Sequence, residues 1–508
     1  MRFAAVDVAV FVAFYGLVLA FSLFKSRGRE TSADYFLGGR ALPWWLIGVS
    51  IVAANISTEQ FVGMAGQAAG DVGLAVSAWQ LTGAVGIVVV GFVFLPRFLR
   101  AGIYTMPEYL EYRYSAAARA IMSVLTVLIY AAVTSAAVLY SGATTLETVF
   151  GLPLAPGVVL IAALAVVYTL WGGLLAAVWA DLFQGSALLV GGLATFALGL
   201  SAVGGWGAFV ARAGERLHMV LPRAHPELPW TVLVGGMWIP IVYYCGLNQF
   251  IVQRTLAARS LKQGQLGIVL AAALWLLIPF GIVMPGILSR ELFGAQLARP
   301  DTAYPVLVRE LVPAGMRGFV FAALAGAVIS TLASVLNSAS TIATMDLYKR
   351  HLRPAAEDRE LVRVGRALTA AFLLVACAVA LSPVPRGGVF RFIQEFQGYL
   401  SPGVVAAFAF GFAVKKAPPA AGIAALLLSA PVYGVLQWGW GDVPYLHRML
   451  VTLGALLAVM AAITAARPLA SPRALPVRAD VDLTPSRLAV AGGVAVVFAV
   501  VAFFVAFR

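Results

Sequence analysis

Residues 54–61 read ANISTEQF, and they interrupt an apolar run that extends from about Trp44 to Ala69. Polar and acidic side chains are costly in the hydrocarbon interior of a membrane, and a carboxylate placed there usually serves a function. A membrane-length segment with such a centre is typical of a discontinuous helix, whose unwound backbone offers its carbonyl and amide groups to a ligand. This octapeptide therefore predicts a binding site in the middle of a transmembrane segment.

The whole chain has the composition of a polytopic membrane protein. Its 508 residues are 61% hydrophobic and 11% charged, which is too little charge to cover a soluble protein of this length. Apolar stretches long enough to cross about 30 Å of hydrocarbon as helices recur throughout. We predict an all-α fold with about fourteen transmembrane helices: 5–24, 42–68, 71–96, 119–146, 155–172, 178–202, 231–252, 265–288, 318–346, 364–383, 390–413, 418–438, 449–466 and 488–506.

The net charge of +13 is explained by membrane topology, so no nucleic-acid partner is expected. If the N-terminus lies outside, 23 of the 35 Lys and Arg residues fall in inner loops and 11 fall outside. The positive-inside rule then predicts a cell-membrane protein with both termini outside. The inner loops are 24–40, 97–119, 252–264, 346–366, 415–416 and 467–487.

Several classes of protein are disfavoured. Cys245 and Cys377 both fall in apolar spans, and the four histidines have no metal-ligand spacing. No Walker A or GxGxxG sequence is present, so neither ATP-driven transport nor a nucleotide cofactor is expected. A membrane-embedded enzyme would need a nucleophile and base or a metal cluster in the spans. A membrane solute sensor, the other non-transporter alternative, would need a signalling domain, which is not expected after Arg508.

A second polar interruption, YYCGLNQF at 243–250, lies five predicted spans after the first. The two interrupted spans begin two blocks of five, 42–202 and 231–413. Because five is odd, the second block must enter the membrane from the opposite side. Paired interruptions in inverted halves indicate a secondary transporter with a midplane site. Each stretch taken alone also fits a polar contact between helices.

The predicted organisation is one transmembrane transporter domain, 1–508. It consists of an extra N-terminal helix at 5–24, a five-plus-five inverted repeat with a broken first helix in each half, and three C-terminal helices within 418–506.

Seven segments, in this order, resemble the sodium/solute symporter family, most closely its sodium/sugar cotransporter branch. The resemblance implies the same five-plus-five architecture, Na⁺ as the coupling ion, and import of a small neutral polar solute such as a sugar or polyol. The segments are ADYFLGGRALPWW (33–45), ANISTEQFVGMAG (54–66), GIYTMPEYLEYRY (102–114), YTLWGGLLAAVWADLFQ (168–184), NQFIVQRTLAARS (248–260), AGAVISTLASVLNSASTIATMDLYK (325–349) and FIQEFQGYLSPG (392–403).

The resemblance implies a sodium site between the first interruption and the ninth span. Its ligands would be the carbonyls of Ala53, Ile56 and Ala327 and the hydroxyls of Ser330 and Thr331. Oxygen is the ligand atom that hard cations take. The alternative is that the two hydroxyls bond back to their own helix.

Asp181 is the second notable charge, in VWADLFQ at the start of the sixth span. The resemblance places a carboxylate there near the path by which the ion leaves for the cytoplasm. The alternative is an interfacial aspartate that reaches water or caps a helix.

The substrate pocket implied by the resemblance is lined from the second, third, seventh, eighth and eleventh spans. Amide and carboxylate groups there suit a hydroxyl-rich ligand, and Tyr244 is expected to stack beneath the bound ring and close the inner route. The matching positions are Asn55, Glu59, Gln60, Gln80, Ile241, Tyr244, Trp275 and Gln394.

Three of these positions depart from the pattern of sugar carriers. Gln80 stands where they have a glutamate, Ile241 where they have a polar residue, and Trp275 where they have a lysine. We therefore expect a different sugar, a cyclitol or another polyol. A monocarboxylate or amino acid is the alternative, because a half-helix N-terminus can hold a carboxylate even though no Arg or Lys maps into the core.

The expected mechanism is Na⁺-coupled symport by alternating access, with proton coupling as the alternative. The expected partners are the solute, Na⁺ and the lipid bilayer, and the protein is expected to be a monomer or a weak homo-oligomer.

Overall fold

The computed structural model describes residues 4–25, 40–297, 299–382, 389–478 and 481–508. The segment 33–39, part of the first family-like string, therefore lies outside the described residues, as does most of the inner loop 24–40. The described residues form helices and no β-strand. Eleven of the described helices are long and apolar enough to cross a membrane, or twelve with one broken pair. The prediction of an all-α polytopic membrane protein is confirmed.

The first half of the chain contains helices that match its predicted spans closely. They are α1 (Ala5–Lys25), α3 (Trp44–Asn55), the π-helical η2 (Glu59–Met64), α4 (Ala65–Ala69), η3 (Gly73–Ser77), α5 (Ala78–Val93), α6 (Leu95–Ala101), α7 (Met106–Arg113), α8 (Ala116–Leu128), the π-helical η4 (Ile129–Thr134), α9 (Ser135–Phe150), α10 (Leu154–Val203), α11 (Trp206–Ala213) and η5 (Gly214–Leu217).

The second half follows the predicted spans in the same way. Its helices are α12 (Trp230–Val234), α13 (Trp238–Gly246), α14 (Gln249–Leu256), α15 (Leu261–Trp275), the π-helical η6 (Pro279–Val283), α16 (Met284–Phe293), η7 (Gly294–Gln296), η8 (Pro300–Thr302), α17 (Ala303–Leu311), α18 (Met316–Ile342), the π-helical η9 (Ala343–Leu352), α19 (Asp358–Ala380), α20 (Val389–Ala413), α21 (Pro419–Gly439), α22 (Tyr445–Ala466) and α23 (Arg487–Ala506).

Two regions differ from the expected one helix per span. The predicted spans 155–172 and 178–202 are joined in the single helical element α10. The predicted span 231–252 is divided into the short helices α12, α13 and α14. The total of fourteen spans and the inverted relation of the two blocks therefore remain predictions.

The first interruption is a break between α3 and η2. These helices meet at an angle of 52°, and Ile56 between them is extended, with φ −82° and ψ 95°. The Ser57 amide donates to Gln60 Oε1 over 2.9 Å instead of to the Ala53 carbonyl of the preceding turn. Polar side chains in the octapeptide thus replace the helical hydrogen bonds, as Ser and Asn-type residues do where helices end.

The second interruption is also present. Helix α13 ends at Gly246 and α14 begins at Gln249, so Leu247 and Asn248 lie outside regular helix. Both polar stretches quoted from the sequence are therefore places where a helix stops and restarts.

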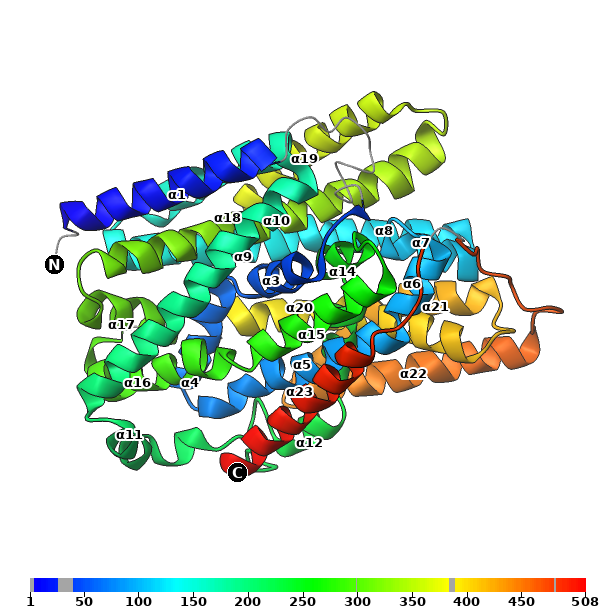
Figure 1. The fold of residues 1–508 in the computed structure, drawn as a ribbon. Helices are drawn as coiled ribbons and strands as arrows, with labels where there is room; N and C mark the ends of the chain where they lie inside the picture. Colours follow the sequence, from blue (N-terminus) through cyan, green and yellow to red (C-terminus); the bar gives the residue numbers. More distant parts are fainter. Residues whose placement is uncertain (1–3, 26–39, 298, 383–388, 479–480) are drawn as a thin grey trace.

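Close helix contacts hold the first break in the centre of the bundle. Helix α3 packs against α10, α15 and α18, and α13 packs against α5 and α20. A Cβ at Gly185 of α10 would lie 2.6 Å from the Ala53 Cβ, so only glycine permits this approach. Figure 1 shows α1 at one edge of this bundle and α22 and α23 at the opposite edge.

Helix α1 is attached to the bundle by a buried acidic side chain. The carboxylate of Asp7 accepts from the Gly315 amide (2.7 Å) and the Gly318 amide (3.0 Å), and pairs with Arg317 (3.0 Å). Both charged side chains are buried. The α17–α18 connection and the start of α18 therefore bind the first turn of α1 through these hydrogen bonds and this ion pair.

We predict that Asp7→Ala lowers the free energy of unfolding by about 3 kcal/mol, because it leaves the Arg317 charge buried without this carboxylate. Thermal unfolding of the purified protein measures the loss. Asp7→Asn, which keeps an acceptor for the two amides, should lose less. Equal stability of the wild type and Asp7→Ala would contradict this account of α1.

Candidate functional site

A pocket with about 550 Å³ of empty space lies beside the first break. It is formed by the broken α3–η2 segment together with α5, α13, α15 and α20. All eight residues predicted for the substrate lie in its wall. The lining residues are Asn55, Glu59, Gln60, Trp79, Gln80, Gly83, Pro240, Ile241, Tyr244, Cys245, Trp275, Phe390, Ile393, Gln394 and Gln397.

Four polar atoms in this wall are buried without a hydrogen-bond partner. Three are acceptors, Asn55 Oδ1, Glu59 Oε2 and Gln394 Oε1, and one is a donor, Trp275 Nε1. An unsatisfied buried polar group costs about 1–3 kcal/mol, so such groups in a native protein need an explanation. Their convergence on one pocket indicates that a ligand or water satisfies them.

The bulky side chains of the pocket are seated against glycines of α5. A Cβ at Gly83 would lie 3.4 Å from Cζ3 of Trp275, and a Cβ at Gly86 would lie 2.4 Å from Cγ2 of Ile241. Two of the three positions that depart from the sugar-carrier pattern, Ile241 and Trp275, therefore form one apolar wall, for which α5 leaves room.

Aromatic and charged contacts close the pocket on the side of Phe390. The Phe390 ring meets Trp79 edge to face at 5.7 Å, and a Cβ at Gly63 would lie 2.7 Å from the Phe390 Cβ. Beyond this ring, Glu227 accepts from Arg391 (3.2 Å) and from Gln67 (3.3 Å). Contacts between α20, α4 and the connection before α12 thus cover this entrance.

Tyr244 closes the opposite side. Its hydroxyl accepts from Asn55 Nδ2 over 3.1 Å, which joins the two broken segments, and its ring meets Phe250 edge to face at 5.6 Å. Tyr130 donates to the side chain of Asn248, the residue at the second interruption. Tyr244 lines the pocket, and its role as a gate stays a prediction.

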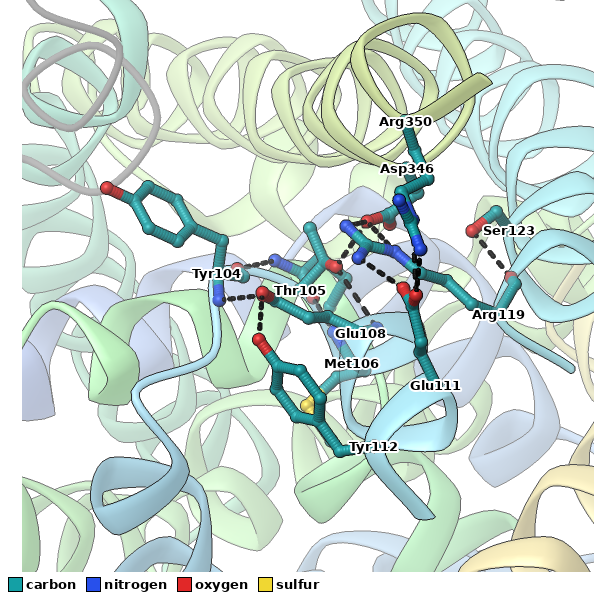
Figure 2. Close-up of polar contacts among 11 residues, drawn as sticks. Tyr104, Thr105, Met106, Glu108, Glu111, Tyr112, Arg119, Ser123, Asp346 and Arg350 are labelled. Carbon is teal, nitrogen blue, oxygen red and sulfur yellow. Dashed lines mark hydrogen bonds and ion pairs between the residues drawn. The ribbon is translucent and has the colours of Figure 1, made fainter. Parts of the chain in front are cut away.

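Beyond the contacts of Tyr244, a second layer of contacts lies at the end of the bundle that is predicted to face the cytoplasm. Gln249 accepts from the Met106 amide (2.8 Å) and donates to the Tyr104 carbonyl (3.1 Å). Between these two, Thr105 donates to Asp346 over 2.8 Å, as Figure 2 shows. The α6–α7 connection is therefore held by the start of α14 and by η9 together.

Arg119 completes this layer. It donates to Asp346 (2.8 Å) and to Glu111 (2.8 Å), and Arg350 donates to the other oxygen of Glu111 (2.6 Å) (Figure 2). Burial raises the pKa of Glu111, but the hydrogen bonds and charges of the two arginines outweigh burial and hold it below its usual value. The cluster links α7, α8 and η9.

The five residues predicted to bind sodium lie on α3, at its end, and on α18, which packs against it. At the break, the Ala53 carbonyl has lost the Ser57 amide to Gln60. Thr331 Oγ1 is buried without a partner, whereas Ser330 donates to Asp181. Ser330 therefore connects the predicted sodium ligands to the predicted exit carboxylate.

Asp181 lies in a buried polar cluster rather than at an interface. It forms an ion pair with Arg254 of α14 over 2.9 Å and accepts from Ser50 of α3 and Ser330 of α18. Arg254 also donates to Ser50 (2.6 Å) and Ser334 (2.8 Å). One ion pair thus joins four helices.

The assignment of Arg254 to an inner loop at 252–264 is wrong, because this side chain is fully buried in α14. The interior of the bundle therefore contains the cation of Arg254. Its charge is directed at Asp181, and the described residues of the pocket lining include no Lys or Arg.

Some site residues were not anticipated. Gln397 and Gly83 each lie three positions after a predicted pocket residue on the same helix, so helical spacing was a usable signal. No sequence signal predicts Trp79 and Phe390 as pocket residues, because an aromatic residue in an apolar span is usually explained by packing between helices. The others are Pro240, Cys245, Ile393, Ser50, Ser334 and Arg254.

Two interrupted helices beside a pocket with converging polar groups are typical of a secondary transporter. The chain belongs to the sodium:solute symporter family, a sequence model of which matches residues 35–428. It is a sodium-coupled multi-pass membrane symporter and not an enzyme. Sodium is its coupling ion.

Relatives of known name are similar over most of the chain. The sodium/glucose cotransporter of Vibrio parahaemolyticus is 38% identical over 90% of this chain and 89% of its own length. The human sodium/myo-inositol cotransporter 2 is 36% identical over 81% of this chain and 66% of its own length. The sheep sodium/glucose cotransporter 1 is 32% identical over 81% of this chain and 68% of its own.

Solved structures share the fold at low sequence identity. A Na⁺-coupled sialic acid symporter in a substrate-bound outward-open state superposes with a TM-score of 0.82 at 21% identity, covering 93% of this chain and all of that one. The nucleobase-cation-symport transporter MHP1 superposes with a TM-score of 0.56 at 17% identity, over 86% and 96%.

We predict that Asp181→Asn and Arg254→Gln each lower the free energy of unfolding by about 3–5 kcal/mol, because each leaves the other charge buried and uncompensated. The double variant should lose clearly less than the sum, which a double-mutant cycle from thermal unfolding measures. The exposed pair Arg309 and Glu310 is the control, with a coupling of about 0–1 kcal/mol. Additive losses at Asp181 and Arg254 would contradict the pairing.

Proposed function

We propose that the protein imports a small neutral polar solute, a sugar or polyol, together with Na⁺ by alternating access. The observation that carries the proposal is the set of unsatisfied groups in the pocket, which consists of three acceptors and one donor. No Lys or Arg is among the lining residues that the structure describes. The names of the relatives, which are glucose and myo-inositol cotransporters, point the same way.

The polar groups suit a ligand with several hydroxyls. Each hydroxyl both donates and accepts, so hydroxyl donors can reach Asn55, Glu59 and Gln394 while a ligand oxygen accepts from Trp275. A carboxyl oxygen of Glu59 can accept from an O–H group of the ligand. A ligand that left one of these groups unpaired would lose about 1–3 kcal/mol.

The apolar wall suits the carbon skeleton of a ring. Trp275, Ile241 and Tyr244 present flat or branched apolar surface beside the polar groups. Such a mixture of apolar surface and a few placed polar atoms is usual for small-molecule sites.

A monocarboxylate or amino acid fits this pocket less well. A buried carboxylate needs a cation or several N–H donors. Among the described lining residues there is no cation, and the buried Arg254 pairs with Asp181.

For sodium, the proposed ligands are the carbonyls of Ala53, Ile56 and Ala327 and the hydroxyls of Ser330 and Thr331. The freed carbonyl at the break and the unpartnered Thr331 hydroxyl supply oxygen atoms of the type that hard cations take. Bound sodium would join α3 to α18 beside the pocket. This arrangement couples ion occupancy to the shape of the solute site.

The proposed route for sodium to the cytoplasm begins at Asp181. Arg254 neutralises this carboxylate, so a departing ion has to compete with the guanidinium. Further along α18, Asn337 has both side-chain polar atoms buried without a partner, and Ser338 and Thr341 bond Gln253. These groups form a polar stripe that water can fill when the helices separate.

The membrane potential supplies part of the driving force. One Na⁺ that moves inward down about 100 mV contributes about 2.3 kcal/mol. The direction of import rests on a cell-membrane location with both termini outside, which we propose from the distribution of Lys and Arg. The inverted repeat of 42–202 and 231–413 within one domain is part of the same proposal.

We predict that uptake into proteoliposomes follows an imposed sodium gradient at fixed pH, and that Ser330→Ala with Thr331→Ala reduces the apparent sodium affinity at least tenfold. The reason is the loss of two of five oxygen ligands. Thr369→Ala, which removes a hydroxyl that bonds back to its own helix in α19, is the matched control. Uptake driven by a proton gradient without sodium would refute the coupling.

We predict that Trp275→Phe weakens binding of the best sugar or polyol about tenfold, because the ring stays and the N–H donor is lost. Ligands are identified by a thermal-shift screen of sugars, polyols and small acids with and without Na⁺, and their affinities are measured calorimetrically. Trp438→Phe, at a 93% exposed position, is the control. A screen in which only small acids stabilise the protein would overturn the solute class and leave the sodium test intact.

A further inference from the structure

A second cavity lies away from the solute pocket, where the last turn of α1 meets the start of α3, the middle of α10 and the α14–α15 connection. It contains about 740 Å³ of empty space, partly open to the surroundings. Its wall is apolar except for two cations. The lining residues are Lys25, Ala41, Leu42, Pro43, Trp45, Leu46, Leu175, Trp179 and Arg259.

Within the part of the chain that the structure describes, the two cations have no ion-pair partner. Neither Lys25 nor Arg259 lies within ion-pair distance of a carboxylate among the described residues. Arg259 donates its Nε to the Ala41 carbonyl over 2.6 Å, which fixes the side chain at the mouth of the cavity. The Lys25 ammonium lies 5.7 Å from the ring centroids of both Phe21 and Trp179. Two positive charges therefore lie at one cavity, and their contacts with described residues are to a carbonyl and to aromatic rings rather than to a carboxylate.

Aromatic side chains surround the cations. Trp45 meets Trp179 edge to face at 6.1 Å, and Trp179 meets Phe21 at 5.8 Å. Trp44 and Trp45 are 39% and 38% exposed. Tryptophan gathers at the level of lipid headgroups because its ring is apolar and its N–H polar. The cavity thus has the lining of a site at the edge of the hydrocarbon layer.

The apolar surface continues from this level toward the hydrocarbon. Phe24 and Leu17 of α1 are 64% and 72% exposed. Acyl chains can cover these side chains, whereas a water-soluble anion cannot. The combination of paired cations, tryptophans and exposed apolar helix surface matches a basic pocket between transmembrane helices that binds an anionic lipid.

We propose that this cavity is a binding site for an anionic phospholipid, whose headgroup phosphate lies between Lys25 and Arg259 and whose acyl chains run along α1. The site borders α3, the first half of the broken segment, because two of the lining residues, Trp45 and Leu46, belong to α3. A lipid held there braces α3 against α1 and α10. The proposal does not depend on which solute the protein carries.

The test uses the full-length protein in detergent with phosphatidylglycerol or with phosphatidylethanolamine of the same acyl chains. Phosphatidylglycerol should raise the melting temperature by about 3 °C, and phosphatidylethanolamine should not. The variant Lys25→Gln with Arg259→Gln should need at least tenfold more phosphatidylglycerol for the same rise. Native mass spectrometry should show one fewer retained anionic lipid.

Two further variants keep the result interpretable. Lys415→Gln with Lys416→Gln removes two exposed charges that line no described cavity, and should respond like the wild type. Lys25→Arg with Arg259→Lys keeps both charges and should also respond, which separates loss of charge from a folding defect.

The proposal is overturned if the Lys25→Gln, Arg259→Gln variant responds at the wild-type lipid concentration, or if the Lys415 and Lys416 variant loses the response equally. In the last part of the experiment, the melting temperature is measured in millimolar sodium phosphate without lipid. Stabilisation by phosphate alone, lost in the same variant, would mean a soluble anion site and would overturn the assignment to lipid.

Discussion

The structure depends on the loss of one backbone hydrogen bond at the end of α3, the bond from the Ser57 amide to the Ala53 carbonyl. The Ser57 amide donates to Gln60 Oε1 and leaves the Ala53 carbonyl without its helical partner. In hydrocarbon an unpaired carbonyl is tolerated only where protein or a polar ligand surrounds it. The break between α3 and η2 therefore has to lie in the centre of the bundle, and the helices around it are arranged to enclose it. Gly185 allows α10 to approach Ala53 closely enough to do so.

The buried ion pair of Asp181 and Arg254 is the second constraint. It joins α10 to α14, and its hydroxyl partners Ser50 and Ser330 bring in α3 and α18. Three helices of the cluster, α3, α14 and α18, also carry residues of the break, of the second interruption or of the proposed sodium site. The cluster therefore connects the proposed sodium site to both interrupted segments. A buried ion pair of this kind adds little stability. It fixes the relative positions of the helices that carry it, because a buried charge without its partner is strongly destabilising.

Contacts close the solute pocket on both sides, and they differ in chemistry. Phe390, Trp79 and the ion pair of Glu227 with Arg391 cover one entrance. Tyr244 with Asn55, followed by the layer of Gln249, Asp346 and Arg119, covers the other. The second closure uses hydrogen bonds between the two broken segments themselves. Rearrangement at either break therefore acts directly on this entrance.

The sequence by itself determined the membrane class, both interruptions, the family and the eight pocket positions, because each rests on local composition or on a contiguous string of residues. Helical spacing from Gln80 and Gln394 reaches Gly83 and Gln397 as well. Only the tertiary structure decided that Arg254, which reads as a loop cation, is buried against Asp181, 73 positions away in the chain. It likewise decided that Phe390 meets Trp79, that Lys25 and Arg259 share a cavity, and that two predicted spans form the single element α10. The physical reason is that burial and charge pairing depend on which helices become neighbours, and local periodicity carries no information on that choice.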